Sequence, residues 1–246
     1  MLRKMREKLN KKKKGFISIV YVVMLLGALV VLGGVLTVYQ HQLIVRNFEA
    51  AADLAAVESL RQAIDEPSLR NEVLAIKEDK LDELRDSFLK KIRNHLPSSS
   101  YEILRVEIPT IDANGVVTIP AGDIKTVAFP NSSAAFSNES TITNPSTGIA
   151  RTSRFIGGNN SDNCAMELAK VSGNLAVSGT KKKDSYILTS KVTIVFKTNS
   201  STNKMAINML NYVNILSGNS RQIVTRQIDE GIIAVTIQAI GEVVLR

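Results

Sequence analysis

The sequence predicts an α+β protein with a long N-terminal transmembrane helix, a second amphipathic helix and an antiparallel β-rich C-terminal domain. Three observations support this fold class. Residues 16–38 contain no charged side chain, apolar residues recur at helical spacing over residues 40–96, and β-branched runs separated by turn residues follow residue 100. With 246 residues, the chain is long enough for one or two domains with a core.

The uncharged run at residues 16–38 predicts a membrane-spanning helix. It is 23 residues long, or about 34 Å as a helix, which matches the roughly 30 Å hydrocarbon core of a bilayer with some tilt. A cleaved secretory signal is the main alternative. Its apolar part is only about 7–15 residues long and ends at a small-residue cleavage site. This run is longer and lacks an Ala-x-Ala site at its end, so we expect an anchor.

The charge of the chain is concentrated before that helix. Residues 1–14 hold eight basic residues and one acid, so they carry +7 of the formal net charge of +8. Basic flanks stay in the cytoplasm, which predicts a cytoplasmic tail or leader at residues 1–15 and an extracytoplasmic domain after the helix. The remaining residues are nearly neutral and offer no basic face for nucleic acid.

Residues 39–97 predict an extracytoplasmic helical hairpin. Residues 40–66 lack Gly and Pro and are rich in Ala, so we expect one helix of about 50 residues from Phe16 to near Glu66, ended by Pro67. Small residues permit the close approach of another helix. The predicted packing residues are Ala51, Ala52, Ala55 and Ala56.

The second helix of this hairpin is predicted to begin at the N-cap Ser68 and to end before Pro97. A short connection between two helices implies an antiparallel pair. The apolar stripe of the second helix suits the core of this chain, although the β-rich domain or a neighbouring subunit are alternatives. Its residues are Leu69, Val73, Ile76, Leu81, Leu84, Phe88, Ile92 and Leu96.

Residues 98–246 predict an antiparallel sheet packed by a helix. A polar loop or insertion is expected at residues 130–163, which are rich in Ser, Thr, Asn and Gly. Hairpin turns are expected at residues 219–220 and 230–231. The predicted strands are 101–108, 116–119, 125–129, 186–196, 223–228 and 232–245, with a short element at 166–177.

No catalytic or cofactor motif is present in the sequence, so we predict a non-enzymatic protein without catalytic, cofactor-binding or metal-binding residues. Cys164 is the single cysteine, which excludes an intrachain disulfide and leaves an inert thiol, an intermolecular bridge or a reactive thiol. His41 and His95 lack companions at metal-ligand spacing. Residues 112–115 partly resemble a calcium loop but lack its other acids, so a β-turn is expected.

The N-terminal segment resembles known pilus proteins. Lys11-Lys12-Lys13-Lys14-Gly15 followed by Phe16 and an apolar helix is similar to the leader of a type IV prepilin, which implies processing by a prepilin peptidase between Gly15 and Phe16. Residues 47–56, Asn-Phe-Glu-Ala-Ala-Ala-Asp-Leu-Ala-Ala, resemble the Ala-rich segment of TadE/TadG-like, tight-adherence (Flp-type) pilus-assembly proteins. The resemblance covers about residues 10–60 and implies the membrane and other pilin-like subunits as partners.

One position departs from the pilin pattern. Pilins carry Glu five residues after the cut, where this chain has Val20. The family's Glu pairs with the amine of a neighbouring subunit, and an unpaired buried ammonium is unfavourable. The chain is therefore expected either to cap a filament or to keep an uncut anchor, which we favour. The alternatives to a pilus component are an anchored extracytoplasmic binding or sensor module and, least favoured, a tethered hydrolase.

Overall fold

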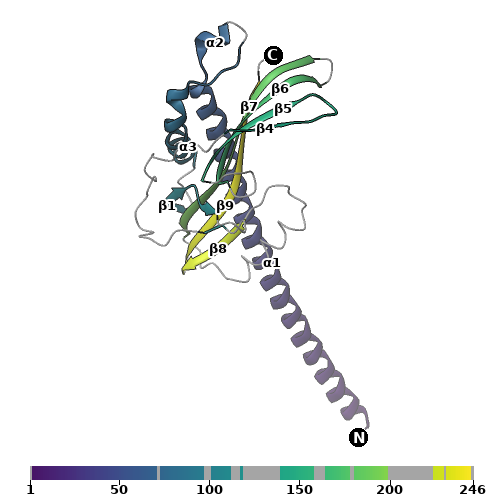
Figure 1. The fold of residues 1–246 in the computed structure, drawn as a ribbon. Helices are drawn as coiled ribbons and strands as arrows, with labels where there is room; N and C mark the ends of the chain where they lie inside the picture. The colour runs from purple at the N-terminus through teal and green to yellow at the C-terminus, as the bar shows by residue number, and fades with distance from the viewer. Residues whose placement is uncertain are drawn as a thin grey trace. The chain divides into compact units, whose positions relative to one another are not determined.

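The computed structural model describes residues 2–70, 73–96, 101–111, 117–118, 139–157, 164–177, 180–198, 224–229 and 231–244. The chain divides into two compact units, Met1–Leu43 and Ile44–Arg246, which are described separately. Its helices are α1 (Leu2–Ala63), α2 (Glu66–Arg70), the short 3-10 helix η1 (Glu78–Lys80) and α3 (Leu81–His95). The fold is α+β, as the sequence predicts (Figure 1).

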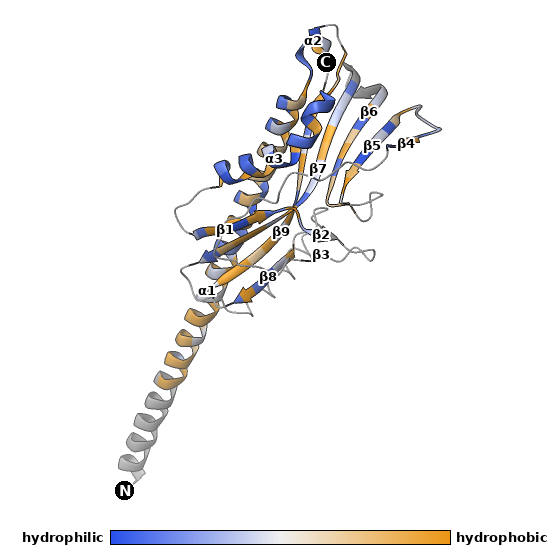
Figure 2. Ribbon diagram, turned by 60° about the vertical axis from the view of Figure 1, so that its left-hand side comes forward, coloured by the Kyte–Doolittle hydropathy of each residue, from blue (hydrophilic) through white to orange (hydrophobic). Residues whose placement is uncertain are grey.

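The first unit consists of the N-terminal part of α1. The helix begins at Leu2 instead of near Phe16, so the backbone of the basic tail is helical as well. Large apolar side chains between Ile19 and Leu36 are exposed, and they form the orange length of α1 in Figure 2. Within the described residues, α1 is the one helix that is long and apolar enough to cross a membrane.

In the second unit α1 ends at Ala63, and the chain then departs from the predicted hairpin. Ser68 is not an N-cap: the Asp65 carboxylate accepts hydrogen bonds from the backbone N–H and hydroxyl of Ser68, inside α2. The following segment is extended, because Asp65 N–H donates to the Ala75 carbonyl and Lys77 N–H to the Ala63 carbonyl. This pairing replaces the first half of the single helix expected over residues 68–96.

The α3 helix contains the buried part of the predicted apolar stripe. Its side chains contact α1 at two levels. Ser87 Oγ lies 3.0 Å from Gln62 Oε1, and His95 Nε2 lies 3.0 Å from Glu58 Oε2. The two helices therefore run antiparallel in this unit. Leu69 and Val73, which were expected on the same stripe, are exposed instead. The buried residues of α3 are Leu81, Leu84, Phe88, Leu89 and Ile92.

The sheet is antiparallel and is centred on the long strands β7 (Thr180–Thr198) and β9 (Ile232–Val244), which pair along most of their length (Figure 1). The neighbouring order is β4-β5-β6-β7-β9-β8, and β1 also pairs with β7. β6 pairs with β7 up to Ser190, and β1 pairs with β7 from Thr193 onwards, so β1 and β6 share one edge of β7. The strands are β1 (Tyr101–Glu107), β4 (Ser140–Thr143), β5 (Ala150–Ile156), β6 (Met166–Val177), β7 (Thr180–Thr198), β8 (Val224–Asp229) and β9 (Ile232–Val244).

The predicted polar loop at residues 130–163 is wrong over its described part. Residues 139–157 contain the β4–β5 hairpin, which extends the sheet by two strands. The exposed strand β4 has no buried apolar side chain, so it lacks the hydrophobic alternation by which strands are identified. A separate pair, β2 (Thr110–Ile111) and β3 (Val117–Thr118), covers part of the expected strand at 116–119. The expected strand at 125–129 and turn at 219–220 lie outside the described residues.

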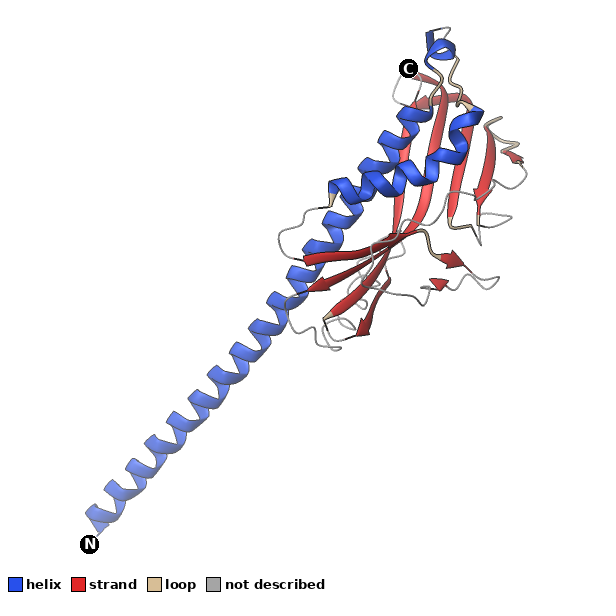
Figure 3. Ribbon diagram, turned by 90° about the vertical axis from the view of Figure 1, so that its left-hand side faces the viewer, coloured by secondary structure: helices blue, strands red, loops and turns tan. Residues whose placement is uncertain are grey.

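The C-terminal turns of α1 and the helix α3 cover one face of the sheet (Figure 3). The Ala-rich face of α1 approaches β9 so closely that a Cβ atom added at Gly241 would lie 2.7 Å from the carbonyl carbon of Ala56. The Asp53 carboxylate also accepts a hydrogen bond from Ile240 N–H, with an N···O distance of 2.8 Å. Small residues on both elements are therefore what allow this contact.

An aromatic cluster occupies the other end of this helix–sheet interface. The Phe48 ring on α1 lies edge-on to Tyr101 of β1 and Phe196 of β7, with centroid distances of 5.2 and 5.1 Å. Phe48 is fully buried. The three rings connect α1 to two strands that are about 90 residues apart in sequence, and they bury a large apolar area.

Candidate functional site

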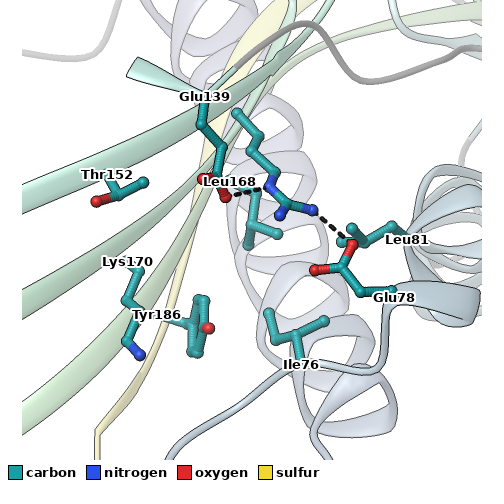
Figure 4. Close-up of a pocket in the computed structure, with 9 residues that line it drawn as sticks. Ile76, Glu78, Leu81, Glu139, Thr152, Leu168, Lys170 and Tyr186 are labelled. Atoms are coloured by element: carbon teal, nitrogen blue, oxygen red, sulfur yellow. Dashed lines mark hydrogen bonds and ion pairs between the residues drawn. The ribbon is translucent and has the colours of Figure 1, made fainter. Parts of the chain in front are cut away.

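A cleft in the second unit lies between the start of α3 and the strands β4 to β7 (Figure 4). Its volume is about 310 Å³. Because alternate side chains of a strand point to the same face, β5 contributes Thr152 and Arg154, and β6 contributes Leu168 and Lys170. The remaining lining residues are Ile76, Glu78, Leu81, Glu139 and Tyr186.

Arg154 is the central charged group of the cleft. Its Nε lies 2.6 Å from Glu139 Oε1 and its Nη1 lies 2.7 Å from Glu78 Oε2. Glu139 directly precedes β4 and Glu78 lies in η1, so one guanidinium connects three separate elements. Hydrogen bonding to these two carboxylates raises the pKa of Arg154 above its ordinary value. The side chain is therefore a fixed cation that is already neutralised by its neighbours.

The sheet side of the cleft also carries Lys170 and Tyr186. Lys170 Nζ lies 3.8 Å from Asp184 Oδ2 and 5.8 Å from the centroid of the Tyr186 ring. Burial raises the pKa of Tyr186, so its hydroxyl stays protonated at neutral pH. With Thr152, these groups offer hydrogen-bond donors beside an apolar surface formed by Ile76, Leu81 and Leu168. Such an arrangement is suited to binding a small polar ligand.

The Arg154 ion pairs predict a modest contribution to stability. Glu78 and Glu139 are well exposed, and exposed pairs contribute about 0–1 kcal/mol. We expect Arg154→Gln to lower the free energy of unfolding by about 1 kcal/mol or less, and the difference to shrink at high salt. Urea denaturation at two salt concentrations measures it, with the exposed Arg226→Gln as the control. A loss that is large and independent of salt would contradict this assignment.

The residues predicted from the sequence lie elsewhere. Gly15 and Phe16 are within α1, where the helix runs without interruption. The four alanines at 51, 52, 55 and 56 are buried in the second unit, and the closest contact described for them is with Gly241 of this chain's own sheet. The packing surface expected to face another helix is therefore covered by the chain itself.

Cys164 is a half-buried cysteine before β6 and is not part of a disulfide. Burial, followed by the negative charge of Glu167, raises its pKa from 9.0 to about 11. Glu167 is held in place by Ser153 and Arg151, at 2.6 and 2.7 Å. Because of this raised pKa, the Cys164 thiol is mostly protonated at neutral pH.

Among the described residues, no group of three or more His, Cys, Asp or Glu side chains forms a metal site.

The raised pKa of Cys164 predicts that its thiol reacts slowly with alkylating reagents. At pH 8 the thiolate population of Cys164 is expected to be roughly 100-fold below that of a thiol whose pKa is 9.0, and the thiolate is the reactive form. Alkylation by iodoacetamide should be slowed by roughly 10-fold, because the higher intrinsic nucleophilicity of a high-pKa thiolate offsets part of the lower population, and its rate should rise up to about pH 11. Removing the nearby charge in Glu167→Gln should speed the reaction. Alkylation as fast as that of free cysteine would show that the pKa is not raised.

The cleft could not be identified from the sequence. Its polar residues come from segments between Glu78 and Tyr186, and part of them lie in the stretch that was expected to be a loop. No short motif connects them, because the sheet register alone places Thr152 beside Lys170 and Arg154 beside Leu168. Comparisons of the chain with protein-family models, with curated proteins and with solved structures found no match.

Proposed function

We propose that this chain is a membrane-anchored structural component of a type IV or Flp-like pilus or secretion assembly, similar to a minor pilin or a TadG-like subunit. The observation that supports it most is the composition of α1. Its apolar side chains between Ile19 and Leu36 are exposed, whereas its alanines from Ala51 to Ala63 are buried in the second unit. One helix thus serves as anchor and as core element, as the resemblance implies.

In this proposal α1 crosses the membrane once. Exposed apolar side chains are unfavourable in water and stable in lipid. The eight basic residues before the apolar run remain in the cytoplasm under the positive-inside rule. The helix then continues outside as one arm of a helical hairpin, with α3 as the second, amphipathic arm, and the sheet is presented outside the cell.

The mechanism is mechanical and requires no catalytic residue. Since the alanines of α1 pack against this chain's own sheet, contacts with other subunits would use the apolar length of α1 within the membrane and the outer surfaces of the sheet. Val20 offers no carboxylate for the amine that processing at Gly15–Phe16 would create. The proposal therefore includes an uncut N-terminus and a permanent anchor.

The test uses a tagged protein expressed at its native level. Sheared surface filaments and membranes are probed for the tag, and piliation is compared between the deletion strain and the parent. We expect reduced or altered piliation on deletion. Mass spectrometry of the N-terminus should find the intact basic tail, whereas a chain beginning at Phe16 would replace the permanent anchor by filament incorporation. Unchanged piliation together with a monomer confined to the membrane would refute the role.

The cleft around Arg154 favours a second candidate, an anchored extracytoplasmic module that binds a cell-wall or extracellular ligand. Thr152, Lys170 and Tyr186 would supply the polar contacts. Co-sedimentation of the full-length protein with purified peptidoglycan sacculi tests this function. Lys170→Ala and Thr152→Val should release the protein from the pellet, and Arg226→Gln on β8 should not. Equal sedimentation of all three variants, or none by the parent, would exclude a cell-wall ligand at this cleft.

A further inference from the structure

The strand β4 forms an exposed edge of the sheet. It is the terminal strand of the order β4-β5-β6-β7-β9-β8, and all four of its residues are exposed. Ile142 is 70% exposed, which is the largest value among the large apolar side chains described in residues 44–246. An edge of this kind presents unpaired backbone groups to which another strand can add.

The other edges of this sheet carry features that prevent such pairing. β8 contains a bulge between Gln227 and Asp229 and an exposed charge at Arg226. The part of β9 that extends beyond β8 is blocked at Ile240, whose N–H donates to Asp53 of α1. β1 has a bulge between Ile103 and Arg105. Bulges, charges and covering elements are the usual protection of sheet edges.

Among the described residues, no bulge, charged side chain or covering element protects β4. Its register with β5 runs without a shift from Ser140 to Thr143, and residues 140–150 contain no charged side chain. Glu139, the nearest acid, is bonded to Arg154 of its own chain. The contrast with the edges at β1, β8 and β9 indicates that, within the described part of the sheet, β4 is the edge suited to a partner strand.

The backbone of β4 determines which residues can pair outwards. Asn144 N–H donates to the Ile149 carbonyl, towards β5. Backbone groups alternate in direction along a strand of an antiparallel ladder, so Ile142 and Ser140 also direct theirs towards β5. Thr141 and Thr143 therefore direct their N–H and C=O groups away from the sheet.

We propose that β4 is a self-association edge that pairs antiparallel with β4 of a second copy of this chain, about a two-fold axis at Ile142. In this register Thr141 of one copy and Thr143 of the other exchange backbone hydrogen bonds, twice by symmetry. The two Ile142 residues face each other as a non-hydrogen-bonded pair, in which side chains lie closest. Both exposed Ile142 side chains become buried.

The strand itself argues for a second copy as the occupant. Its outward groups at Thr141 and Thr143 are two residues apart, so the strand is complementary to itself in one register, with matching sheet faces. The absence of charge on residues 140–150 removes like-charge repulsion between the copies. The interface is small compared with the roughly 1,200–2,000 Å² of stable complexes, so a weak dimer is expected. The inference does not depend on the pilus role.

The test is cysteine crosslinking of the full-length protein in membranes. In a Cys164→Ser background, Ile142→Cys is oxidised with copper phenanthroline, and the two thiols should form an intermolecular disulfide. A non-hydrogen-bonded pair has Cα atoms about 4.5 Å apart, which fits disulfide geometry. Thr141→Cys is the matched control. This residue is also exposed, but in the proposed register it faces Thr143 of the other copy, so the two introduced thiols do not meet. We expect a several-fold higher dimer yield for Ile142→Cys, because one specific register brings only this pair of thiols together.

Two added changes should abolish this yield. Thr143→Pro removes an outward N–H that the chain's own ladder does not use, and Pro is tolerated at such edge positions. Ser140→Lys adds a charge of the type that protects other edges. Unchanged urea unfolding midpoints would show that both variants remain folded. Equal crosslinking at positions 141 and 142, no crosslinking at 142, or yields that folded Thr143→Pro and Ser140→Lys proteins leave intact would overturn the proposal.

Discussion

Gly241→Val is expected to destabilise the second unit by about 3 kcal/mol or more, because the close approach of α1 to β9 leaves no space for a side chain. A Cβ at this position would lie 2.7 Å from the carbonyl carbon of Ala56 and from the amide nitrogen of Val57. Both are backbone atoms of a helix and cannot rotate away. Overpacking of a close-packed interface typically costs about 1–3 kcal/mol, and more where the backbone must move. Urea denaturation of the full-length protein in detergent measures the effect.

Two comparisons identify the cause of that loss. Gly27→Ala changes a glycine with nothing within 4 Å of the added Cβ, so it should leave the unfolding midpoint nearly unchanged. Ala56→Gly combined with Gly241→Val removes only the Cβ that lies 2.8 Å away, so it should restore little. Full recovery in the double variant would show that side-chain contact, and not the helix backbone, sets the limit.

Phe48→Ala is expected to lower the free energy of unfolding by about 3–5 kcal/mol, the usual range for removing a fully buried Phe. Phe48 is buried on all sides and contacts the rings of Tyr101 and Phe196. The variant leaves a cavity between α1 and the strands β1 and β7. Chemical denaturation gives the magnitude, and hydrogen exchange in β1 should rise, because this strand pairs only with β7 in the described sheet.

Phe48→Leu separates the ring contacts from the cavity. It keeps most of the volume but loses two edge-to-face contacts, each of about 0.5–1.5 kcal/mol, so an intermediate loss is expected. Leu54→Ala on the same helix is the control, since Leu54 is about half exposed and should lose less than about 1 kcal/mol. Losses at Phe48 no larger than at Leu54 would mean that the cluster does not hold α1 to the sheet.

The sequence was informative where one physical signal dominates. The charge-free run at residues 16–38 and the absence of Gly and Pro over residues 40–66 predict the long helix. The β-branched runs predict β8 and β9 close to their observed bounds, whereas the run at residues 186–196 covers only part of β7, which begins at Thr180. The two ends of the helix were less accurate. Its start at Leu2 places a strongly basic segment in a helix, and its end at Ala63 depends on backbone pairing with residues 75–77.

Other features depend on contacts that a sequence pattern does not contain. The alanines at 51, 52, 55 and 56 were expected to pack against another helix, but the close approach described for Ala56 is to Gly241 of the sheet, nearly 190 residues away in the chain. Leu69 and Val73 share a helical periodicity with Ile76, yet both are exposed. The short helix α2 ends at Arg70, and the pairing of Ile64 with Ile76 takes the place of one continuous helix. The cleft is assembled by strand register, so no local motif identifies Arg154.

β1 and β6 lie one after the other along the same edge of β7, although β1 ends at Glu107 and β6 begins at Met166. The intervening chain leaves this edge and returns to it, which makes it an excursion from an otherwise continuous row of strands. Thr152, Arg154 and the open strand β4 all lie in this excursion, whereas α1, β7 and β9 lie outside it. The strands β7 and β9 pair with each other without any residue of this excursion, which adds the β4–β5 hairpin on the far side of β6. A designer could replace the residues of the β4–β5 hairpin to change this side of the sheet while keeping the pairing of β7 with β9.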